Sequence, residues 1–448
     1  MRKGNREDAK TRRTSLKRLR VFASSWLPLI VSFAIAACGT SPERTDSITT
    51  ERAAVLPAGA PSDFWKPSPI GDAPAAREQP QIANVAVVDL DADGLPDVLV
   101  CDAGRRKLSW LRQAPKGVYT EQVIADIRAP GHVEAIDHDG DGDLDLLVAD
   151  LGELFPSNQR IGSVIVLENA GSGRFVRHAA AEGLPRVADV RGGDLDGDGD
   201  QDLAVAAFGY DQGQTLWLEN RGTWSYAVHV LQELSGAVNV VVADFDRSGT
   251  LDIAALISQE WEEIWMFTNA GGGRFTPRLV WGSSNADFGS SWLAPVDLDR
   301  DGDTDLLYSN GDAFDYAPAN SRPWHGVQWL ENQGTNTFAL HRIGDLSGAS
   351  SPVAFDADQD GDIDVAVVSA YNAWSDPAAL SLIWLENNGR QQFTMHAVAR
   401  APTHLITLAA ADLDGNGAPD LVTGGMHISA PYDRMSRVML WRNGGATR

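Results

Sequence analysis

Short apolar runs alternate with polar, glycine-containing turns along most of the chain, and almost no segment has the apolar spacing of a helix. One order of elements recurs. An apolar run such as Val240–Ala243 leads into an aspartate-rich turn, and a second run, such as Asp364–Val368, follows a turn directly. A third run carries Trp-Leu-Glu-Asn or a close variant, and a fourth follows a glycine turn. The pattern predicts an all-β repeat of four short strands.

The aspartate-rich turn has the form D-x-D-x-[DNS]-G-x-x-D and marks the period of the repeat. Its seven copies begin at Asp89, Asp137, Asp194, Asp244, Asp297, Asp356 and Asp412, at intervals of 48, 57, 50, 53, 59 and 56 residues. A solenoid needs shorter repeats, and the β-branched flanks contradict a dockerin-like pair of helices. Four strands per repeat of this length predict an all-β, seven-bladed β-propeller.

The two ends of the repeat array indicate how the ring closes. The seventh unit stops after Trp441–Asn443 without a fourth strand, whereas Phe64–Asp72 resembles a fourth strand such as Phe338–Asp345. Pairing of this N-terminal strand into the last blade would remove an exposed edge, and Pro67 and Pro69 suit an outermost strand. The alternative is a plain linker. We predict one propeller domain over residues 64–448.

On these repeats the chain resembles the FG-GAP/VCBS-type repeat propellers, which include the propeller of integrin α subunits and some fungal lectins. The resemblance covers about 385 residues and all seven predicted blades. The acidic turn is its most specific element, and Phe208-Gly209 is the best match to the Phe-Gly mark that names the family. The resemblance implies a propeller with calcium-binding turns.

The acidic turns also predict metal sites from their chemistry. Calcium prefers six to eight oxygen ligands in flexible geometry, whereas magnesium demands an octahedron and retains more water. The aspartates at positions one, three and five alternate toward one centre, the glycine permits the tight turn, and the ninth-position aspartate returns from the next strand. Ordinary Asp/Gly β-turns are the alternative, but seven copies in register favour up to seven Ca²⁺ ions. Near-identical sites in every blade indicate a structural role, because a catalytic site would occur once.

The predicted metal ligands follow the repeat. Five copies are complete: Asp89, Asp91, Asp93, Asp97; Asp137, Asp139, Asp141, Asp145; Asp194, Asp196, Asp198, Asp202; Asp297, Asp299, Asp301, Asp305; and Asp356, Asp358, Asp360, Asp364. Two copies have one charge less, since Ser248 joins Asp244, Asp246 and Asp252, and Asn416 joins Asp412, Asp414 and Asp420.

The loops opposite the acidic turns vary most and are the candidate ligand-binding face. Those of blades five to seven mix aromatic with polar residues, as in carbohydrate or peptide recognition. The candidate ligand-binding residues are Asp312, Trp324, Tyr371, Asn372, Trp374, Asp376, His427, Tyr432 and Arg434. Alternatively, these side chains cover the channel mouth and pack on one another.

Catalytic motifs are missing from the sequence. There is no H-E-x-x-H, no G-x-S-x-G and no phosphate-binding P-loop. His132 and His404 fall in loops that can reach a central pocket, although isolated histidines are usually structural. We therefore predict a binding, adhesion or scaffold module for carbohydrate or protein, with no catalytic residues. The alternative is an enzyme acting on polysaccharide, with a pocket over the channel.

The N-terminus predicts export. Basic residues precede the apolar run Val21–Ala37, and Ile35–Cys38 resembles the lipobox of bacterial lipoproteins. We predict a signal peptide over residues 1–37, lipidation of Cys38 and a flexible tether over residues 38–63. A membrane-spanning helix is the alternative, although the run is marginal in length. Arg12-Arg13 leaves twin-arginine export open. Gly39 resembles an outer-membrane sorting signal, so the anchor is expected in the bacterial outer membrane and the lipid is the only membrane contact.

The net charge limits the possible binding partners, and the cysteine content limits the possible disulfides. The net charge is −24, and residues 1–37 hold nine of the 37 basic and two of the 61 acidic residues, so the remainder has a net charge of −31. Such a surface repels phosphate, which excludes nucleic acid as a partner. Only Cys101 remains as a thiol once Cys38 is lipidated, so no internal disulfide is expected.

Overall fold

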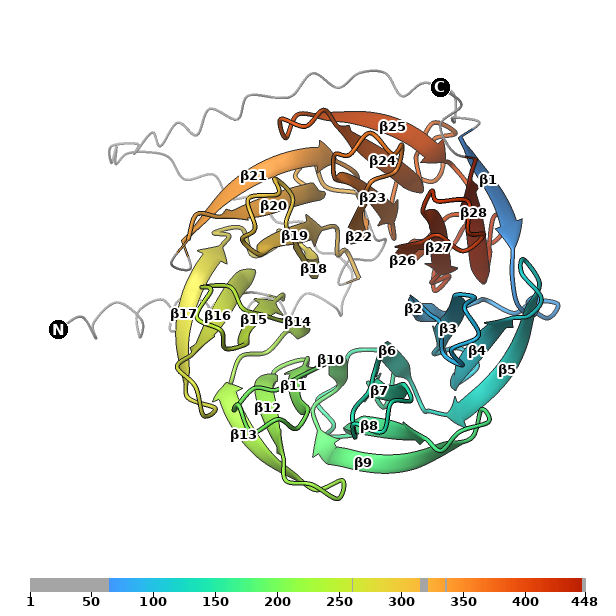
Figure 1. Ribbon diagram of the computed structural model, residues 1–448. Helices are drawn as coiled ribbons and strands as arrows, with labels where there is room; N and C mark the ends of the chain where they lie inside the picture. The colour runs from blue at the N-terminus through green and yellow to red at the C-terminus, as the bar shows by residue number, and fades with distance from the viewer. Residues whose placement is uncertain (1–63, 260, 315–320, 335–336, 445–448) are drawn as a thin grey trace, which may run out of the picture. The chain divides into compact units, whose positions relative to one another are not determined.

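The repeat array forms a ring of seven four-stranded antiparallel sheets (Figure 1). The computed structural model describes residues 64–444 except 260, 315–320 and 335–336. Each sheet is one blade of a β-propeller, and in the first six blades the strands run in sequence order from the centre of the ring outward. The predicted all-β, seven-bladed architecture is therefore confirmed.

The two inner strands of each blade flank the acidic turn. The first strands are β2 (Ile82–Val88), β6 (Pro130–Ile136), β10 (Val187–Gly193), β14 (Ala237–Ala243), β18 (Ser290–Val296), β22 (Ala349–Phe355) and β26 (Leu405–Ala411). The second strands are β3 (Asp97–Asp102), β7 (Asp145–Asp150), β11 (Asp202–Ala207), β15 (Asp252–Ile257), β19 (Asp305–Asn310), β23 (Asp364–Ser369) and β27 (Asp420–Gly425). Every residue of the second strands is buried, which explains their continuous apolar sequence.

The two outer strands of each blade face the neighbouring blades and solvent. The third strands are β4 (Lys107–Gln113), β8 (Gly162–Asn169), β12 (Gln214–Asn220), β16 (Glu263–Asn269), β20 (Gly326–Asn332), β24 (Leu382–Asn387) and β28 (Val438–Asn443). The fourth strands are β5 (Tyr119–Asp126), β9 (Phe175–Leu184), β13 (Tyr226–Gln232), β17 (Phe275–Gly282), β21 (Phe338–Asp345), β25 (Phe393–Ala399) and, in the seventh blade, β1 (Trp65–Pro69).

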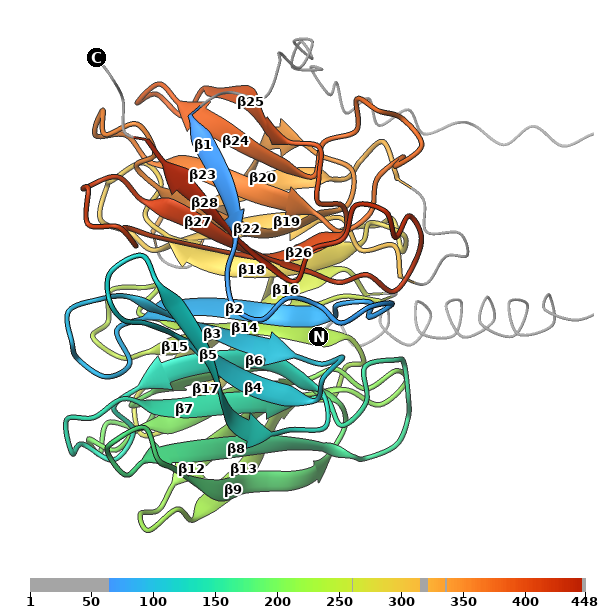
Figure 2. The same cartoon turned by 90° about the vertical axis from the view of Figure 1, so that its right-hand side faces the viewer.

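Strand β1 closes the ring as predicted. It pairs antiparallel with β28, in a register that sets Trp65 opposite Asn443 and Pro69 opposite Met439. Both views draw β1, in blue, along the outer edge of the red seventh blade (Figures 1 and 2). Trp65 is buried, and Phe64 stacks on Trp384 of the sixth blade with ring centroids 5.3 Å apart. The first strand in sequence thus completes the last sheet and packs on its neighbour.

Apolar side chains fill the spaces between blades. One cluster joins Ala204 and Trp217 of the third blade to Val240 and Phe267 of the fourth. The third-strand asparagines add polar connections between neighbouring blades. The side-chain amide nitrogen of Asn269 donates to the main-chain carbonyl of Leu195 in the preceding blade, at 2.7 Å.

The same asparagine contact occurs in two further blades. The Nδ2 atoms of Asn332 and Asn443 donate to the carbonyls of Phe245 and Ala357, both at 2.8 Å. Each acceptor is the second residue of an acidic turn in the preceding blade. In the fourth, fifth and seventh blades the third-strand asparagine therefore ties the blade to the acidic turn of the previous one, whereas Asn220 and Asn387 donate within their own blades.

No helix in the described part of the chain is long and apolar enough to cross a membrane. The predicted signal peptide, Cys38 and the tether lie outside the described residues.

Candidate functional site

The acidic turns fold through their own aspartates. In the third blade, Asp194 accepts hydrogen bonds from the backbone nitrogens of Gly197, at 2.6 Å, and Gly199, at 3.2 Å. Gly199 has a φ of +97°, where a side chain would strain the backbone. The fifth-position side chain makes a local turn, because Asp198 Oδ1 accepts from the nitrogen of Asp200 at 2.9 Å. These Asx-type contacts preorganise the loop.

The ninth-position aspartate joins the turn to the rest of the blade. Asp202 is buried; its Oδ1 accepts from the nitrogen of Asn220 at 2.7 Å, and its Oδ2 accepts from that of Leu195 at 3.0 Å. The matching aspartate of every blade makes the same two contacts. One carboxylate therefore fixes the second turn residue and the end of the third strand together.

The first, third and ninth aspartates converge in all seven blades. Their ligand oxygens lie within 4.8 Å of one another in seven groups, of which five are Asp89–Asp91–Asp97, Asp137–Asp139–Asp145, Asp194–Asp196–Asp202, Asp244–Asp246–Asp252 and Asp297–Asp299–Asp305. The fifth-position aspartates predicted from the sequence are not members of these five groups. Three carboxylates with room for water and carbonyl ligands form a donor set that suits a hard cation such as Ca²⁺.

Burial makes the uncompensated negative charge of these groups unfavourable. It raises the pKa of Asp145, Asp202, Asp252, Asp305 and Asp420 to about 6, and neighbouring carboxylates add to the effect. In two blades a first-position oxygen, on Asp297 or Asp356, is buried without a hydrogen-bond partner. A cation at the centre of each group would neutralise the charge and satisfy these oxygens.

The first blade differs from the others. Arg112 of β4 reaches into its turn, with Nε 2.6 Å from Asp91 Oδ2 and Nη2 3.3 Å from Asp93 Oδ2. The equivalent residue of the second blade is Glu168, which pairs instead with His178 at 2.6 Å. The guanidinium therefore supplies positive charge directly to two carboxylates of the first-blade turn.

The two copies with a substituted fifth position keep the turn through local contacts. Ser248 Oγ lies 2.8 Å from Thr250 Oγ1, and Asn416 Oδ1 accepts from the nitrogen of Ala418 at 2.7 Å. Asn416 Nδ2 also donates to the carbonyl of Asn443 at 3.0 Å. The missing carboxylate thus changes the charge of the site but not the fold of the loop.

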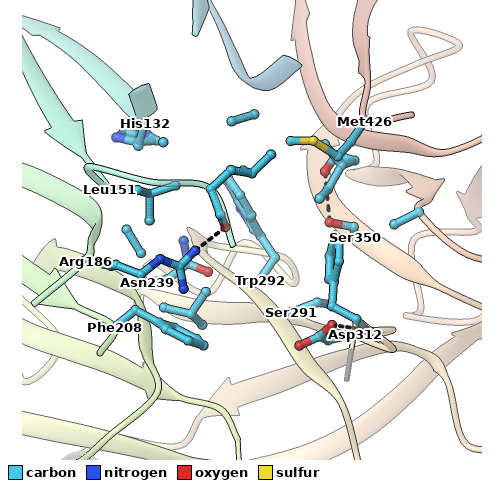
Figure 3. Close-up of a pocket in the computed structure, with 18 of the residues that line it drawn as sticks. His132, Leu151, Arg186, Phe208, Asn239, Ser291, Trp292, Asp312, Ser350 and Met426 are labelled. Carbon is cyan, nitrogen blue, oxygen red and sulfur yellow. Dashed lines mark hydrogen bonds between the residues drawn. The ribbon is translucent and has the colours of Figure 1, made fainter. Parts of the chain in front are cut away.

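A cavity of about 300 Å³ lies at the opposite ends of the first strands (Figure 3). Its walls are mainly apolar and include Leu151, Phe208 and Met426. The polar groups include Arg186 and Asp312. Seven-residue first strands span about 20 Å, so the cavity and the metal turns occupy opposite faces of the ring.

Comparisons with known proteins bear on the repeats. A family model described as the FG-GAP-like repeat matches residues 82–148 and 194–255. The chain thus carries FG-GAP-like repeats. They form a seven-bladed propeller with repeated aspartate triads. A comparison with curated proteins gives no match.

Two solved structures with similar chains are crystals of BBS1N in complex with ARL6DN, one soaked with mercury and one with lead. Both are 11% identical to this FG-GAP-like chain, and in each case the alignment covers 85% of this chain and 97% of the other. The TM-scores are 0.49 and 0.47.

The candidate ligand-binding residues of the sixth and seventh blades pack mostly on one another. Tyr371, Trp374 and His427 are buried, and all three rings contact His404. Arg434 donates to the carbonyl of Trp374 at 2.7 Å. This cluster links the two blades and leaves little ring surface for a ligand.

The other candidates are dispersed. Trp324 is half-buried and donates from Nε1 to the carbonyl of Asp287, and Asn372 donates to the carbonyl of Leu380. Asp376 accepts from the nitrogen of Ala378, and Tyr432 is exposed. Of the nine candidates, Asp312 alone lines the cavity.

Sequence analysis missed most of the cavity. Arg186 and Asn239 line it, yet neither lies in a motif. Arg186 follows β9, and Asn239 is the third residue of β14. The one sequence feature that could have indicated these residues was their place in the repeat, because loops between fourth and first strands lie on the face opposite the acidic turns.

Proposed function

We propose that the protein is an exported calcium-binding propeller that binds a carbohydrate or protein partner with the face opposite its metal turns. One observation carries this proposal: the seven first strands end at carboxylate triads and begin at an open apolar cavity. The triads would hold the blades in place, and the cavity face would make the contact. Concave, mainly apolar pockets with a few polar groups are the usual form of ligand sites.

Calcium is expected to stabilise the fold. A cation that binds the native triads and not the unfolded chain stabilises by mass action, by about 2.7 kcal/mol per site at a hundredfold excess over Kd. Metal analysis should therefore find several Ca²⁺ ions per chain, and a chelator should lower the melting temperature. Asp202→Asn should lose one ion, and Asp126→Asn, on an exposed outer strand, should lose none. An unchanged melting curve in chelator, with no bound calcium, would refute the metal role.

The binding face can be tested without knowing the partner. Phe155 is 60% exposed at the rim of the cavity, and Val228 is 48% exposed on the outer strand β13. Glycan-array and pull-down screens with the calcium-loaded protein should find a partner that Phe155→Asp loses and Val228→Asp keeps. Equal loss in both variants, or in neither, would contradict binding at this face.

Export and anchoring rest on the sequence. Cells fed a palmitate analogue should label the wild-type chain, and Cys38→Ser should abolish both the label and recovery in the membrane fraction. The control Cys101→Ser should keep both. An unlabelled wild-type chain in the soluble fraction would contradict the lipid anchor.

A further inference from the structure

The cavity is built by one irregularity repeated around the ring. Strand pairing skips the second residue of six first strands, which produces a β-bulge there. The skipped residues all line the cavity: Ala83, Gly131, Ala188, Val238, Ser291 and Ile406. Most of these side chains are short, so the inner ends of the blades leave open space. The cavity is therefore part of the repeat geometry.

Arg186 is a buried cation without a carboxylate partner among the described residues. It is 7% exposed, and its Nε and Nη2 donate to the main-chain carbonyls of Glu153 and Leu154. Its guanidinium lies over the ring of Phe208, with Cζ 5.2 Å from the centroid. These carbonyls orient the group without neutralising it, and the Glu153 carboxylate interacts with it electrostatically but forms no ion pair.

Arg437 shows the usual arrangement of a buried guanidinium in this same fold. It is 3% exposed and pairs with both Asp102 and Glu121. A buried charge is energetically costly unless it is paired. Arg437 has its carboxylate partners, whereas Arg186 forms no ion pair within the described part of the chain and can still accept one from a ligand. Burial also lowers the pKa of Arg186 to about 10, which leaves it charged at neutral pH.

Asn239 supplies an unsatisfied acceptor in the same cavity. It is 3% exposed, and its Nδ2 donates to Asp189 Oδ2 at 3.2 Å. Its Oδ1 is buried without a hydrogen-bond partner. Figure 3 draws Arg186 and Asn239 on one side of the cavity and Asp312 on the other. A ligand at Arg186 thus meets a cationic donor and a neutral acceptor.

We infer that the cavity binds an apolar group that carries a carboxylate next to an amide N–H, as an N-acyl amino acid or the last residue of a peptide does. The carboxylate would lie on Arg186, the N–H would donate to Asn239 Oδ1, and the apolar side chain would fill the space beside Phe208 and Trp292. The volume of about 300 Å³ corresponds to about ten waters at about 30 Å³ each, enough for one large side chain with its terminal group. This inference rests on the proposal that this face binds a ligand.

Matched probes test the charge requirement. Calorimetric titration of the calcium-loaded protein should show N-acetyl-phenylalanine binding about ten- to a hundredfold more tightly than N-acetyl-phenylalaninamide, the range for a hydrogen bond to a charged group. An acetylated pentapeptide ending in phenylalanine distinguishes the two sources of this chemistry, the end of a peptide and a small N-acyl amino acid. Tighter binding of its free-acid form than of N-acetyl-phenylalanine indicates a peptide terminus, and equal or weaker binding indicates a small molecule.

Variants locate the site. Arg186→Met should remove the preference for the acid over the amide, while Arg160→Met, an exposed arginine in the β7–β8 loop, should keep it. Ala188→Phe should fill the cavity while Arg186 is retained, and it should block both probes even if Arg186→Met fails to fold. Equal affinity for acid and amide in the wild-type protein would overturn the inference. So would an undiminished preference for the acid in a folded Arg186→Met variant.

The two proposals fail separately. The carboxylate inference is wrong if no acid probe binds at concentrations up to about 10 mM. That result would mean a binding free energy weaker than about −3 kcal/mol. A partner found by glycan array or pull-down and lost in Phe155→Asp would then still support binding at this face. Failure of both experiments would remove the proposed function as well.

Discussion

Replacement of Arg437 by methionine should weaken the contact between the last and first blades. Arg437 precedes β28, and its Nε lies 2.9 Å from Asp102 Oδ2. Its Nη1 and Nη2 each lie 2.6 Å from an oxygen of Glu121 on β5. The three side chains are 2%, 1% and 5% exposed, so methionine would remove the closely paired cation from two buried carboxylates, and Asp102 would keep only the longer contact with Arg105 Nε at 3.8 Å.

Breaking a buried ion pair from one side costs about 3–5 kcal/mol. Two remaining contacts favour the lower end of this range here. The nitrogen of Arg105 still donates to Asp102 Oδ1 at 2.8 Å, and that of Asp72 to Glu121 Oε2 at 2.8 Å. With an unfolding entropy of about 2.1 cal/mol/K per residue over about 380 residues, a loss of about 3 kcal/mol lowers the melting temperature by about 4 °C.

Differential scanning calorimetry of the calcium-loaded protein at neutral pH measures this shift. Arg442→Met is the matched control, because Arg442 donates to Ser68 Oγ at 3.0 Å and forms no ion pair with a described residue. The control should lower the melting temperature by about 1 °C or less, since an ordinary hydrogen bond contributes about 1 kcal/mol. A shift below about 1 °C in a natively folded Arg437→Met variant would refute the reasoning.

Three further predictions concern single side chains. Arg112→Gln should free the first-blade turn and increase bound calcium by one ion per chain in metal analysis; unchanged stoichiometry would contradict competition between Arg112 and the metal. Burial raises the pKa of Glu262 to about 7, so its contribution to stability is present below pH 4.5 and decreases by about 3 kcal/mol as pH rises through 7. Glu262→Gln should flatten the corresponding slope of unfolding free energy against pH, measured with urea in excess calcium, and an identical slope would sink this assignment. Asp189→Asn should cost about 3 kcal/mol in the same assay at pH 7, because Arg191 Nε lies 3.3 Å from the buried Asp189 carboxylate, and wild-type stability would show that the pair contributes little.

Much of the fold was predictable because the determining information is local and repeated. Each acidic turn lies between two apolar strands, so seven copies gave seven blades. The closing strand was predictable because the last repeat lacked a fourth strand and the segment around Trp65 matched one. The role of the third-strand asparagines was not predictable, because Asn443 acts on the carbonyl of Ala357 in another blade.

The cavity depends on information that a single repeat does not carry. Six of its lining residues lie one or two repeats apart in the sequence, and a β-bulge leaves no distinctive residue type at Ala83 or Ser291. The burial of the loop aromatics was not predictable from the sequence either. Tyr371 and Trp374 have the composition of a binding loop, but contacts with His404 bury them.

The pairing of Trp65 with Asn443 also has a consequence for biosynthesis. Strand β1 is the first propeller strand to leave the ribosome, and its partner β28 is the last. During synthesis β1 remains without a partner while six blades emerge, and the seventh sheet cannot form until β28 has been translated. Loss of β28 by premature termination would leave β1 and β27 each with an open edge and would uncover the face of the sixth blade that packs on the seventh. A ring of this kind therefore closes only after β28 has been made, so a product that lacks β28 exposes strand edges open to aggregation and proteolysis.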